Sequence, residues 1–377
     1  MTRSPGRDTP VSDDPPVTSS GASYAAAGVD IKAGERAVEL MRSAVAETAR
    51  LEVRGGIGGF AGLFDATALT RYRQPLLATS TDGVGTKVAI AAALGSYDTV
   101  GQDLVGMVVD DLVVCGAEPL FLTDYLATGK VVPERVARIV AGVAAGCVRA
   151  GCALLGGETA EHPGLLGPDE FDLAGAATGV VEAADLLGPD RVVAGDVVVA
   201  IASSGLHSNG YSLVRHVLLD PSAGAGWALE RDVPELGRAL GQELLEPTLI
   251  YASDCLALIR AAPVHAMAHV TGGGLAANLA RSLPAGVHAV IDRGSWSLPP
   301  VFALIADVGK VGLPELERTL NVGVGMAVVL PADAATAAVN LLADRGLRAW
   351  MAGTLKPDRE PSPGSRSGTA ELVGRYA

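Results

Sequence analysis

The stretch PLLATSTDGVGTK, residues 75–87, begins as a short apolar run and ends abruptly in polar residues and glycines. The run at 75–81 predicts a buried strand, and Asp82, Gly83, Gly85 and Lys87 follow at its end. Folds that mix helices and strands place ligand-binding groups at strand ends. A carboxylate there suits a hard cation and a lysine suits a phosphate, although a plain polar turn with Lys87 in solvent fits the same residues.

Strands and helices alternate around this stretch. We expect helices over 35–50, 99–115, 133–150, 211–218, 248–260, 275–281, 301–308, 314–320 and 332–344, and further strands over 153–155, 173–181, 196–202, 266–270, 287–291, 325–330 and 348–352. The two series predict an α+β or α/β protein with two domains, an N-terminal domain of a sheet with helices (23–187) and a C-terminal mixed α/β domain (188–355). Tails rich in Pro, Ser and charge predict disorder over 1–22 and 356–377.

Composition narrows the function classes. The 377 residues carry a formal net charge of −13, and an acidic surface repels nucleic-acid phosphates, so we expect no nucleic-acid partner. Four cysteines without C-x-x-C spacing predict neither a disulfide scaffold nor a zinc knuckle, which favours a reducing cytoplasm. The N-terminus has no apolar signal segment, and Arg138 and Arg149 interrupt the most apolar stretch, so we expect no membrane span.

Two groups of glycines stand where backbone N–H groups could approach an anion. The string RGGIGGF contains Gly55, Gly56, Gly58 and Gly59, and TGGG occupies 271–274 before a predicted helix. The first string does not follow a strand with G-x-G-x-x-G spacing, so the dinucleotide fingerprint is absent. A phosphate cradle and a flexible loop both fit the first group, whereas the second predicts an anion site at a helix start.

A pair of adjacent aspartates lies on the predicted helix 99–115. On a helical wheel Asp111 falls on an apolar face between Leu104 and Met107, while Asp110 points to a different side. A buried carboxylate is costly unless it is paired or binds a metal. Asp111 therefore either meets a neighbouring arginine or backbone group, or binds Mg²⁺ together with Asp82.

The loop GGETAEH, residues 156–162, crowds Glu158, Thr159 and neighbouring polar groups after a predicted strand. Oxygen-rich loops suit Mg²⁺ and its waters, although an ordinary solvated acidic loop has the same composition.

A second polar loop, SSGLHSNGYS at residues 203–212, joins a predicted strand to a helix. Ser208 or Asn209 could cap that helix, whose N-terminus would attract an anion. His207 just before the cap either contacts substrate or plays a structural part. The tail GVGTK lacks the earlier glycine of a P-loop, and G-x-S-x-G and H-E-x-x-H are absent from the sequence. The combined pattern predicts binding of a Mg²⁺-nucleotide and a phosphorylated substrate.

Taken together, these motifs resemble the family of phosphoribosylformylglycinamidine cyclo-ligases, also called AIR synthetases. The resemblance rests on the strings SYAAAGVDI, GGIGGF, TDGVGTK, DDLVVCGAEPLFLTDYLATGK, LGGETAEHPG, FDLAGAATG, ASSGLHSNGYSLVR, EPTLIY, HVTGGGLAANLAR and NVGVGM, which follow one another from residue 23 to 326. TDGVGTK and TGGG also occur in the wider superfamily of ATP-using enzymes. The strings with SSGLHSNGYSLVR and CGAEPLF point to the cyclo-ligases.

This resemblance implies a homodimer in which the N-terminal sheets of two subunits face each other as a sheet or barrel, with ATP bound nearby. It implies ATP-dependent closure of the imidazole ring of formylglycinamidine ribonucleotide, which gives aminoimidazole ribonucleotide, ADP and phosphate in purine biosynthesis. ATP would phosphorylate the formamide oxygen, and the amidine nitrogen would displace phosphate. Positioning and charge neutralisation would do most of the catalytic work.

The resemblance also implies roles for particular residues. Mg²⁺ would be held by Asp82 and Asp111, and the catalytic residues would be Lys87, Asp111 and His207. The nucleotide would be bound by Gly55, Gly56, Gly58, Gly59, Asp82, Gly83, Gly85, Lys87, Glu158 and Thr159. The substrate would be bound by Ser204, His207, Ser208, Asn209 and, through its 5-phosphate, Thr271, Gly272, Gly273 and Gly274.

Three positions depart from the family pattern: Ala25 replaces a lysine, Asp110 replaces an asparagine and His162 replaces a methionine. Ala25 removes an expected nucleotide contact, and Asp110 adds negative charge near the proposed metal. Two alternatives stay open, a relative with another substrate, such as a thiamine-phosphate kinase or selenophosphate synthetase, and a nucleotide-binding scaffold without activity. The absence of a cysteine before Cys115 argues against selenophosphate synthetase.

Overall fold

The computed structural model describes residues 29–56, 58–358, 364 and 366–377, and the predicted N-terminal tail and Ala25 lie outside these ranges. Its α-helices are α1 (Ile31–Glu47), α2 (Val88–Leu94), α3 (Val100–Val113), α4 (Pro133–Ala150), α5 (Tyr211–Leu218), α6 (Leu240–Leu244), α7 (Ala252–Ala261), α8 (Gly274–Arg281), α9 (Pro300–Gly309), α10 (Leu313–Thr319) and α11 (Ala335–Asp344). Its strands are β1 (Val53–Arg54), β2 (Leu63–Phe64), β3 (Pro75–Gly83), β4 (Glu118–Thr128), β5 (Ala153–Glu161), β6 (Phe171–Glu182), β7 (Val197–Ala202), β8 (Asp232–Val233), β9 (Arg238–Ala239), β10 (Ala266–His269), β11 (Val287–Asp292), β12 (Val324–Leu330), β13 (Ala349–Pro357) and β14 (Thr369–Val373). Short 3₁₀ helices cover Ala66–Arg71, Gly85–Lys87, Ala183–Asp185, Pro189–Arg191, Arg293–Ser295 and Ala332–Ala334.

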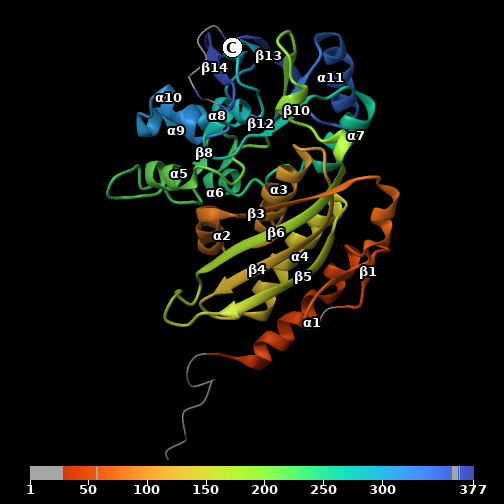
Figure 1. The fold of residues 1–377 in the computed structure, drawn as a ribbon. Helices are drawn as coiled ribbons and strands as arrows, with labels where there is room; N and C mark the ends of the chain where they lie inside the picture. The colour runs from red at the N-terminus through yellow and green to blue at the C-terminus, as the bar shows by residue number, and fades with distance from the viewer. Residues whose placement is uncertain (1–28, 57, 359–363, 365) are drawn as a thin grey trace, which may run out of the picture.

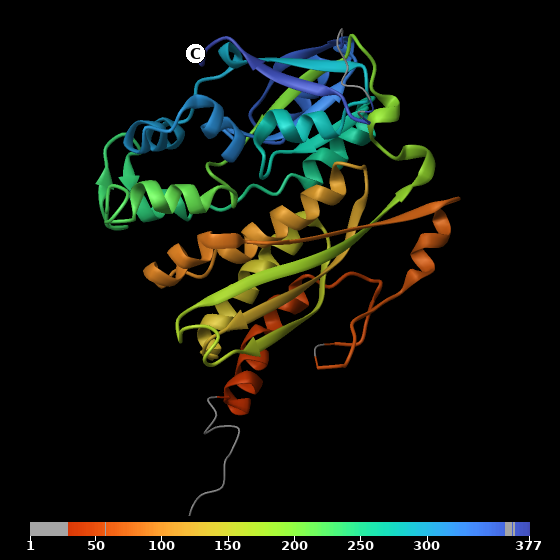
Figure 2. The same cartoon turned by 60° about the vertical axis from the view of Figure 1, so that its left-hand side comes forward.

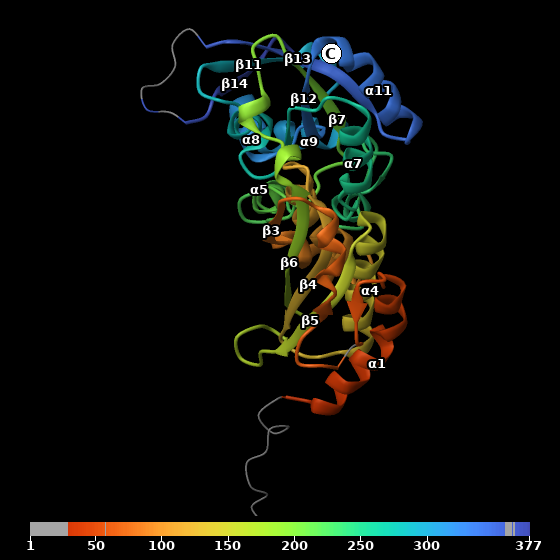
Figure 3. The same ribbon diagram turned by 45° about the vertical axis from the view of Figure 1, so that its right-hand side comes forward.

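The N-terminal domain is a four-stranded sheet with helices on one face (Figure 1). Its strand order is β3-β6-β4-β5, with β4 and β5 parallel and the other neighbours antiparallel. Helix α3 packs on β3 and β6, α4 packs beside α3, and α1 packs on α4. Figure 3 shows α4 and α1 on the same side of this sheet. On the opposite face Leu77 and Tyr125 are exposed, so this face is apolar in part and uncovered within one chain.

Strand β4 is central in that sheet, yet the sequence pattern did not predict it. Its sequence EPLFLTDYLAT contains Pro119, and the register with β6 shifts between Pro119 and Phe121. A bulge breaks the alternation of buried and exposed residues by which a strand is recognised. Strand β5 also continues to Glu161, so Glu158 and Thr159 lie in a strand and not in the predicted loop.

The C-terminal domain is built on a six-stranded sheet with the order β10-β12-β7-β13-β11-β14. Helix α8 contacts β10 and β14 and α11 contacts β13, and Figure 2 shows this domain stacked above the N-terminal one. The predicted boundary at 187/188 falls in the connection between β6 and β7. The prediction of a disordered tail over 356–377 was wrong for 369–373, because β14 pairs in parallel with β11, with Ala370 and Leu372 packed against the core.

Helix α3 lies between the two domains and contacts both the N-terminal sheet and α7. All but two of its fourteen residues are buried. Among the helices of the described ranges, none has the length and apolarity that a membrane crossing requires.

Candidate active site at the domain junction

Three titratable side chains from both domains meet beside α3. Asp82 ends the run of β3, Asp111 lies on α3, and His269 ends β10 of the C-terminal domain. His269 Nδ1 lies 3.0 Å from Asp111 Oδ1, and Ser80 Oγ lies 3.5 Å from Asp111 Oδ2. The Gly83 N–H donates to Asp82 Oδ1 at 2.7 Å. The cluster therefore combines side chains from the end of β3, from α3 and from β10 of the C-terminal domain.

The charges in this cluster influence one another. Burial raises the pKa of Asp82, and the Asp111 carboxylate raises it further. Burial opposes protonation of His269, but its hydrogen bond to Asp111 and the charges of Asp110, Asp111 and Asp82 together raise the pKa of its imidazole. His269 Nε2 is buried without a hydrogen-bond partner among the described residues. A protonated His269 would thus carry a buried Nε2–H that has no acceptor among the described residues.

The helical wheel predicted a buried Asp111 and an Asp110 on another side of α3, but in the structure Asp110 is buried and Asp111 is exposed. Asp110 is fully buried and both of its oxygens accept from the Tyr251 N–H, at 3.0 and 3.1 Å, whereas the Asp111 side chain is 42 % exposed. Burial raises the pKa of Asp110 to about 7. The helical wheel could not tell which aspartate is buried, because α3 is apolar on nearly all sides and has no single buried face. The added carboxylate of Asp110 ties the two domains together, and Asp111 remains accessible.

His207 lies in the core beneath this junction and is only 1 % exposed. Its Nε2 accepts from the Ser204 N–H at 3.2 Å, while Nδ1 is buried and unpartnered in the described part of the chain. Burial, with the charges of His269 and Lys87, lowers the pKa of His207 far below its usual value. The ring is therefore neutral and carries its proton on Nδ1. Gly325 is required beside it, because a Cβ there would overlap His207 and the Tyr251 hydroxyl.

Lys87 does not lie in a phosphate site. It is fully buried, and its ammonium donates to Asp103 Oδ1 at 2.8 Å and to the backbone carbonyls of His207 at 3.1 Å and Glu246 at 2.6 Å. Three donor protons thus have three acceptors inside the protein. The predicted phosphate contact and catalytic role of Lys87 are corrected to a buried ion pair with Asp103 of the same domain and hydrogen bonds to two carbonyls of the C-terminal domain.

The serines of the 203–212 loop are used mainly inside the protein. Ser204 Oγ donates to a backbone carbonyl at 2.7 Å, and Ser208 Oγ shares a hydrogen bond with Thr248 Oγ1 at 3.2 Å. Ser208 is buried, which leaves its hydroxyl little access to a substrate. Asn209 is only half-buried, and its Nδ2 lies 3.5 Å from Met107 Sδ, one helical turn before Asp111. Asn209 is therefore the member of this loop that reaches the junction.

The loop 271–274 lies beside Asn209, because a Cβ at Gly272 would be 3.7 Å from Asn209 Oδ1. Its shape is held by Asn278, whose amide donates to the carbonyls of Gly272 at 3.2 Å and of its neighbours. Gly273 takes a left-handed conformation and precedes α8. This loop thus joins the Asp82–Asp111–His269 cluster at the start of a helix, where backbone N–H groups attract anions.

The other predicted glycine group contributes to a separate pocket of about 630 Å³. One side of the pocket is formed by α1 and by the loop that contains Gly56, Gly58 and Gly59. The other side is formed by parts of β4 and β5, including Glu158 and Thr159 of β5. Gly55 lines the adjoining pocket of about 230 Å³, together with Arg42 and Arg54. The structure therefore brings the two predicted nucleotide motifs together, away from Lys87.

The two sites are linked through the sheet. Asp82 and Asp124 both pair with Gly175, one on each side of β6, so they lie in one row about 10 Å apart. Leu104 of α3 packs over Gly175 between them. The two carboxylates consequently point to the same side of the sheet without touching.

A metal ion would meet only two carboxylates here. Within the described ranges no group of three or more His, Cys, Asp or Glu side chains is arranged to hold one. Asp82 is half-buried beside the exposed Asp111, and their repulsion favours a cation between them. Because Mg²⁺ commonly takes one or two carboxylates and completes its shell with waters and phosphates, these residues fit it.

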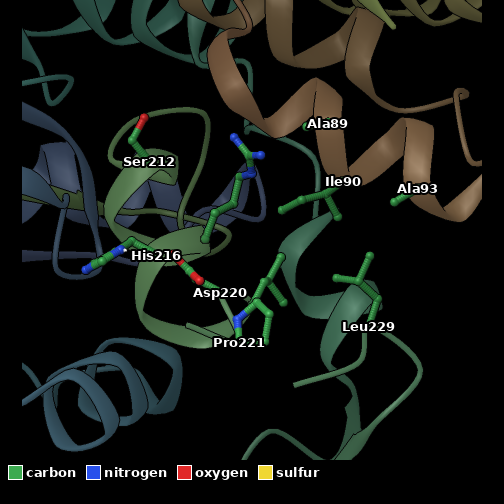
Figure 4. Close-up of a pocket in the computed structure, with 10 residues that line it drawn as sticks. Ala89, Ile90, Ala93, Ser212, His216, Asp220, Pro221 and Leu229 are labelled. Carbon is green, nitrogen blue, oxygen red and sulfur yellow. Dashed lines mark ion pairs between the residues drawn. The ribbon is translucent and has the colours of Figure 1, made fainter. Parts of the chain in front are cut away.

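Another pocket, of about 500 Å³, lies between α2 and α5 (Figure 4). Ile90, Ala93 and Leu229 give it an apolar wall, and His216 pairs with Asp220 at 3.6 Å on its rim. None of the predicted site residues lines this pocket. Its composition does not indicate the predicted nucleotide or substrate chemistry.

Comparison with known proteins shows the family to which the chain belongs. The AIR synthase related protein N-terminal domain matches residues 64–181, and the corresponding C-terminal domain matches 193–364. A phosphoribosylformylglycinamidine cyclo-ligase of Anaeromyxobacter sp. (strain Fw109-5) is 50% identical over 352 residues, which cover 93% of this chain and 98% of the relative. The chain belongs to the phosphoribosylformylglycinamidine cyclo-ligase family. The cyclo-ligase of Shouchella clausii (strain KSM-K16) is 49% identical over 334 residues, covering 89% of this chain and 96% of the relative.

Solved structures share the fold of this cyclo-ligase family member at lower identity. Thiamine-monophosphate kinase from Stenotrophomonas maltophilia K279a superposes with a TM-score of 0.62 at 20% identity, covering 91% of this chain and 97% of the kinase. Hydrogenase maturation protein HypE in complex with ATP superposes with a TM-score of 0.61 at 17% identity, covering 90% and 91%. The predicted fold class and family are confirmed.

Sequence reasoning missed two residues. His269 lies near the end of the predicted strand 266–270, and a polar residue at a strand end is the same signal that singles out Asp82. Asp124 was hidden in the unpredicted strand β4. In both cases the sequence does not show which helix or strand packs beside the residue in the folded protein.

Proposed function

We propose that this chain uses ATP to close the imidazole ring of formylglycinamidine ribonucleotide, releasing aminoimidazole ribonucleotide, ADP and phosphate in purine biosynthesis. The observation that carries the proposal is about 50% identity, over nearly the full length, to proteins named phosphoribosylformylglycinamidine cyclo-ligase. The cluster at the domain junction supplies groups suited to that chemistry. The acidic net charge supports a small-molecule substrate in preference to a nucleic acid.

The formamide oxygen is a poor leaving group until it is phosphorylated, after which the amidine nitrogen displaces phosphate and the ring closes. His269 lies opposite Asp111, and its free Nε2 can donate a hydrogen bond to charge that develops on oxygen. The neutral His207 is buried and accepts from the Ser204 N–H, so we assign it the role of positioning the 203–212 loop beside the site. Asn209 and the 271–274 loop would hold the substrate and its 5-phosphate.

Mg²⁺ would be held by Asp82 and Asp111, where it would neutralise phosphate charge. The nucleotide would occupy the pocket of the 55–59 loop, with Glu158 and Thr159 at its wall. The row through β6 separates Asp124 of this pocket from Asp82 by about 10 Å, with Leu104 of α3 packed between them. Lys87 is not part of this proposal, since its side chain is fully buried.

A homodimer is supported by the uncovered face of the N-terminal sheet. Leu77 is 63 % exposed there, and Tyr125 also reaches solvent. An apolar face of a sheet is usually covered by another layer. A second copy placing the same sheet against it would supply that layer, and the four free cysteines are consistent with a reducing cytoplasm.

The proposal is tested by measuring ADP release from Mg²⁺-ATP with formylglycinamidine ribonucleotide, with thiamine monophosphate, and with neither. We expect ADP only with the ribonucleotide, in equal amounts to aminoimidazole ribonucleotide. ADP formation with thiamine monophosphate alone would support the kinase alternative. Nucleotide binding without turnover of either substrate would support the scaffold alternative.

A further inference from the structure

Both loops proposed to bind the substrate pack on one short segment, residues 317–321, which includes the end of α10 and the two residues after it. On one side of this support segment, a Cβ at Gly274 would overlap the backbone carbonyl oxygen of Glu317. The first residue of α8 therefore lies directly against the backbone of α10. Because protein interiors are close-packed, a movement of α10 would move the 271–274 loop with it.

The other side of the support segment holds the 203–212 loop. Asn321 Nδ2 donates to the Gly205 carbonyl at 2.8 Å. A Cβ at Gly210 would overlap the Leu320 side chain, so the two are packed without a gap. The support segment therefore sets the distance between the loop proposed to hold the 5-phosphate and the loop proposed to hold the rest of the substrate.

The support segment is anchored by the Glu317 carboxylate, which accepts three hydrogen bonds. Arg293 donates from Nε to Oε1 at 2.6 Å and from Nη2 to Oε2 at 2.8 Å, and the Tyr376 hydroxyl donates to Oε1 at 2.7 Å. The Glu317 side chain is only 12 % exposed. A bidentate arginine–carboxylate pair fixes an angle as well as a distance, so it determines both the position and the rotation of the end of α10.

The C-terminal segment of the chain completes this anchor. Arg293 Nη1 donates to the Leu372 carbonyl of β14 at 2.6 Å. The Tyr376 ring packs edge-on against Trp296, with ring centroids 5.2 Å apart, and Trp296 Nε1 donates to the Val322 carbonyl at 3.0 Å, one residue after the support segment. Part of the stretch that the sequence predicted as a disordered tail thus holds the support of both loops.

Stability alone does not require this arrangement, because apolar side chains of similar size often replace a buried ion pair without loss. We propose that Glu317, held by Arg293 and Tyr376, is a positioning residue for formylglycinamidine ribonucleotide. It keeps the 271–274 and 203–212 loops at the spacing that the substrate requires, as supporting residues do for a binding site. This inference rests on the proposed function and extends its substrate site to the C-terminal segment.

The test measures kcat and the KM values for formylglycinamidine ribonucleotide and for ATP in the full-length protein, below the melting range. Glu317→Gln replaces one accepting oxygen with an NH₂ group, which cannot accept from the arginine. We expect its KM for the ribonucleotide to rise at least about 10-fold while kcat changes less than about 3-fold, since the lost contacts hold a part of the substrate that does not react. The KM for ATP should stay within about 2-fold, because the residues proposed to bind the nucleotide lie in the N-terminal domain.

Tyr376→Phe is the milder variant. It keeps the ring against Trp296 and removes one hydrogen bond, so it should fold and raise the KM for the ribonucleotide about 3-fold. Asp254→Asn is the matched control, because Asp254 pairs with Arg345 at 2.6 Å in the same domain and joins α7 to the end of α11. Whatever it does to the melting temperature, it should leave both KM values unchanged.

A purely structural role for Glu317 predicts a lower melting temperature with unchanged KM values, and that result in a folded Glu317→Gln would overturn the proposal. If Glu317→Gln does not fold, an unchanged KM for the ribonucleotide in Tyr376→Phe overturns it. A KM for ATP that rises in parallel, or a control that behaves like Glu317→Gln, would also contradict it. In each of these cases wild type still forms ADP with the ribonucleotide, so only this inference fails. If wild type forms none, the proposed function fails and this inference fails with it.

Discussion

Replacing Lys87 with methionine should destabilise the protein strongly, because this lysine belongs to a buried ion pair of the N-terminal domain that is hydrogen-bonded to the C-terminal domain. Neither Lys87 nor Asp103 has any exposed side-chain area. Asp103 Oδ1 also accepts from the Thr248 N–H at 2.8 Å and from its hydroxyl at 2.7 Å. Burial lowers the pKa of Lys87 and raises the pKa of Asp103, so each charge depends on the other to remain in the core.

The magnitude follows from what the substitution leaves behind. Lys87→Met leaves a buried carboxylate without its cation, and removing one partner of such a pair costs about 3–5 kcal/mol of unfolding free energy. At about 2–4 °C per kcal/mol, the melting temperature should fall by about 6–20 °C. The double variant Lys87→Met/Asp103→Asn removes both charges yet keeps an acceptor for Thr248, and should regain part of the loss. Two backbone carbonyls still lack their donor, so recovery should be incomplete.

The assay is thermal and urea unfolding of wild type, both single variants and the double variant, with the KM for ATP measured below the melting range. A buried ion pair that anchors the C-terminal domain through its hydrogen bonds predicts large losses of stability in the single variants, with coupling between the two sites. The reasoning is refuted if Lys87→Met unfolds as wild type does while its KM for ATP rises 10-fold or more. That result would return Lys87 to the phosphate contact that the sequence predicted.

Three other predictions concern the metal, the nucleotide pocket and the C-terminal strand. Asp82→Asn should lower kcat by about 100-fold with an unchanged melting temperature and oligomeric state, and near-normal turnover would remove Asp82 from the site. Folding raises the pKa of Asp124 to about 7, so between about pH 4 and pH 7 the folded protein keeps a proton that the unfolded chain has lost, and its free energy of unfolding falls as the pH rises. The free energy of unfolding, measured from pH 5 to 8, should therefore fall more steeply in wild type than in Asp124→Asn. Equal pH dependence in the two proteins would contradict the raised pKa. Deleting 366–377 removes β14 from its pairing with β11 and should lower the C-terminal domain's calorimetric transition temperature, whereas an unchanged transition would show that β14 contributes nothing.

The elements with clear local signals were predicted closely. Helix α4 runs from Pro133 to Ala150 as expected, because proline opens its first turn and Gly151 ends it in a left-handed conformation. Helix α5 also has the predicted bounds. Strands β4 and β14 were missed, the first because a bulge interrupts its alternation, the second because it follows a segment rich in Pro, Ser and Gly.

The sequence predicted which residue types form the candidate site, but it did not predict which side chains are buried or which residues they contact. Asp82 and Asp111 could be chosen because polar residues at a strand end and on an apolar helix are unusual, yet the wheel could not orient Asp110 and Asp111. Helix α3 is covered on one side by the sheet and on another by the second domain, so its apolar surface has no single direction. The partners of Lys87 lie up to 159 residues away in sequence, and local pattern contains no information on such contacts.

The most direct test of the central claim follows the formamide oxygen. Formylglycinamidine ribonucleotide labelled with ¹⁸O at the formyl group is incubated with the protein and Mg²⁺-ATP, and the phosphate is analysed by mass spectrometry. Because the oxygen would be phosphorylated and would then leave as the ring closes, the account predicts one ¹⁸O in each phosphate released and one ADP for each aminoimidazole ribonucleotide. Unlabelled phosphate, or ring closure without ADP, would contradict it.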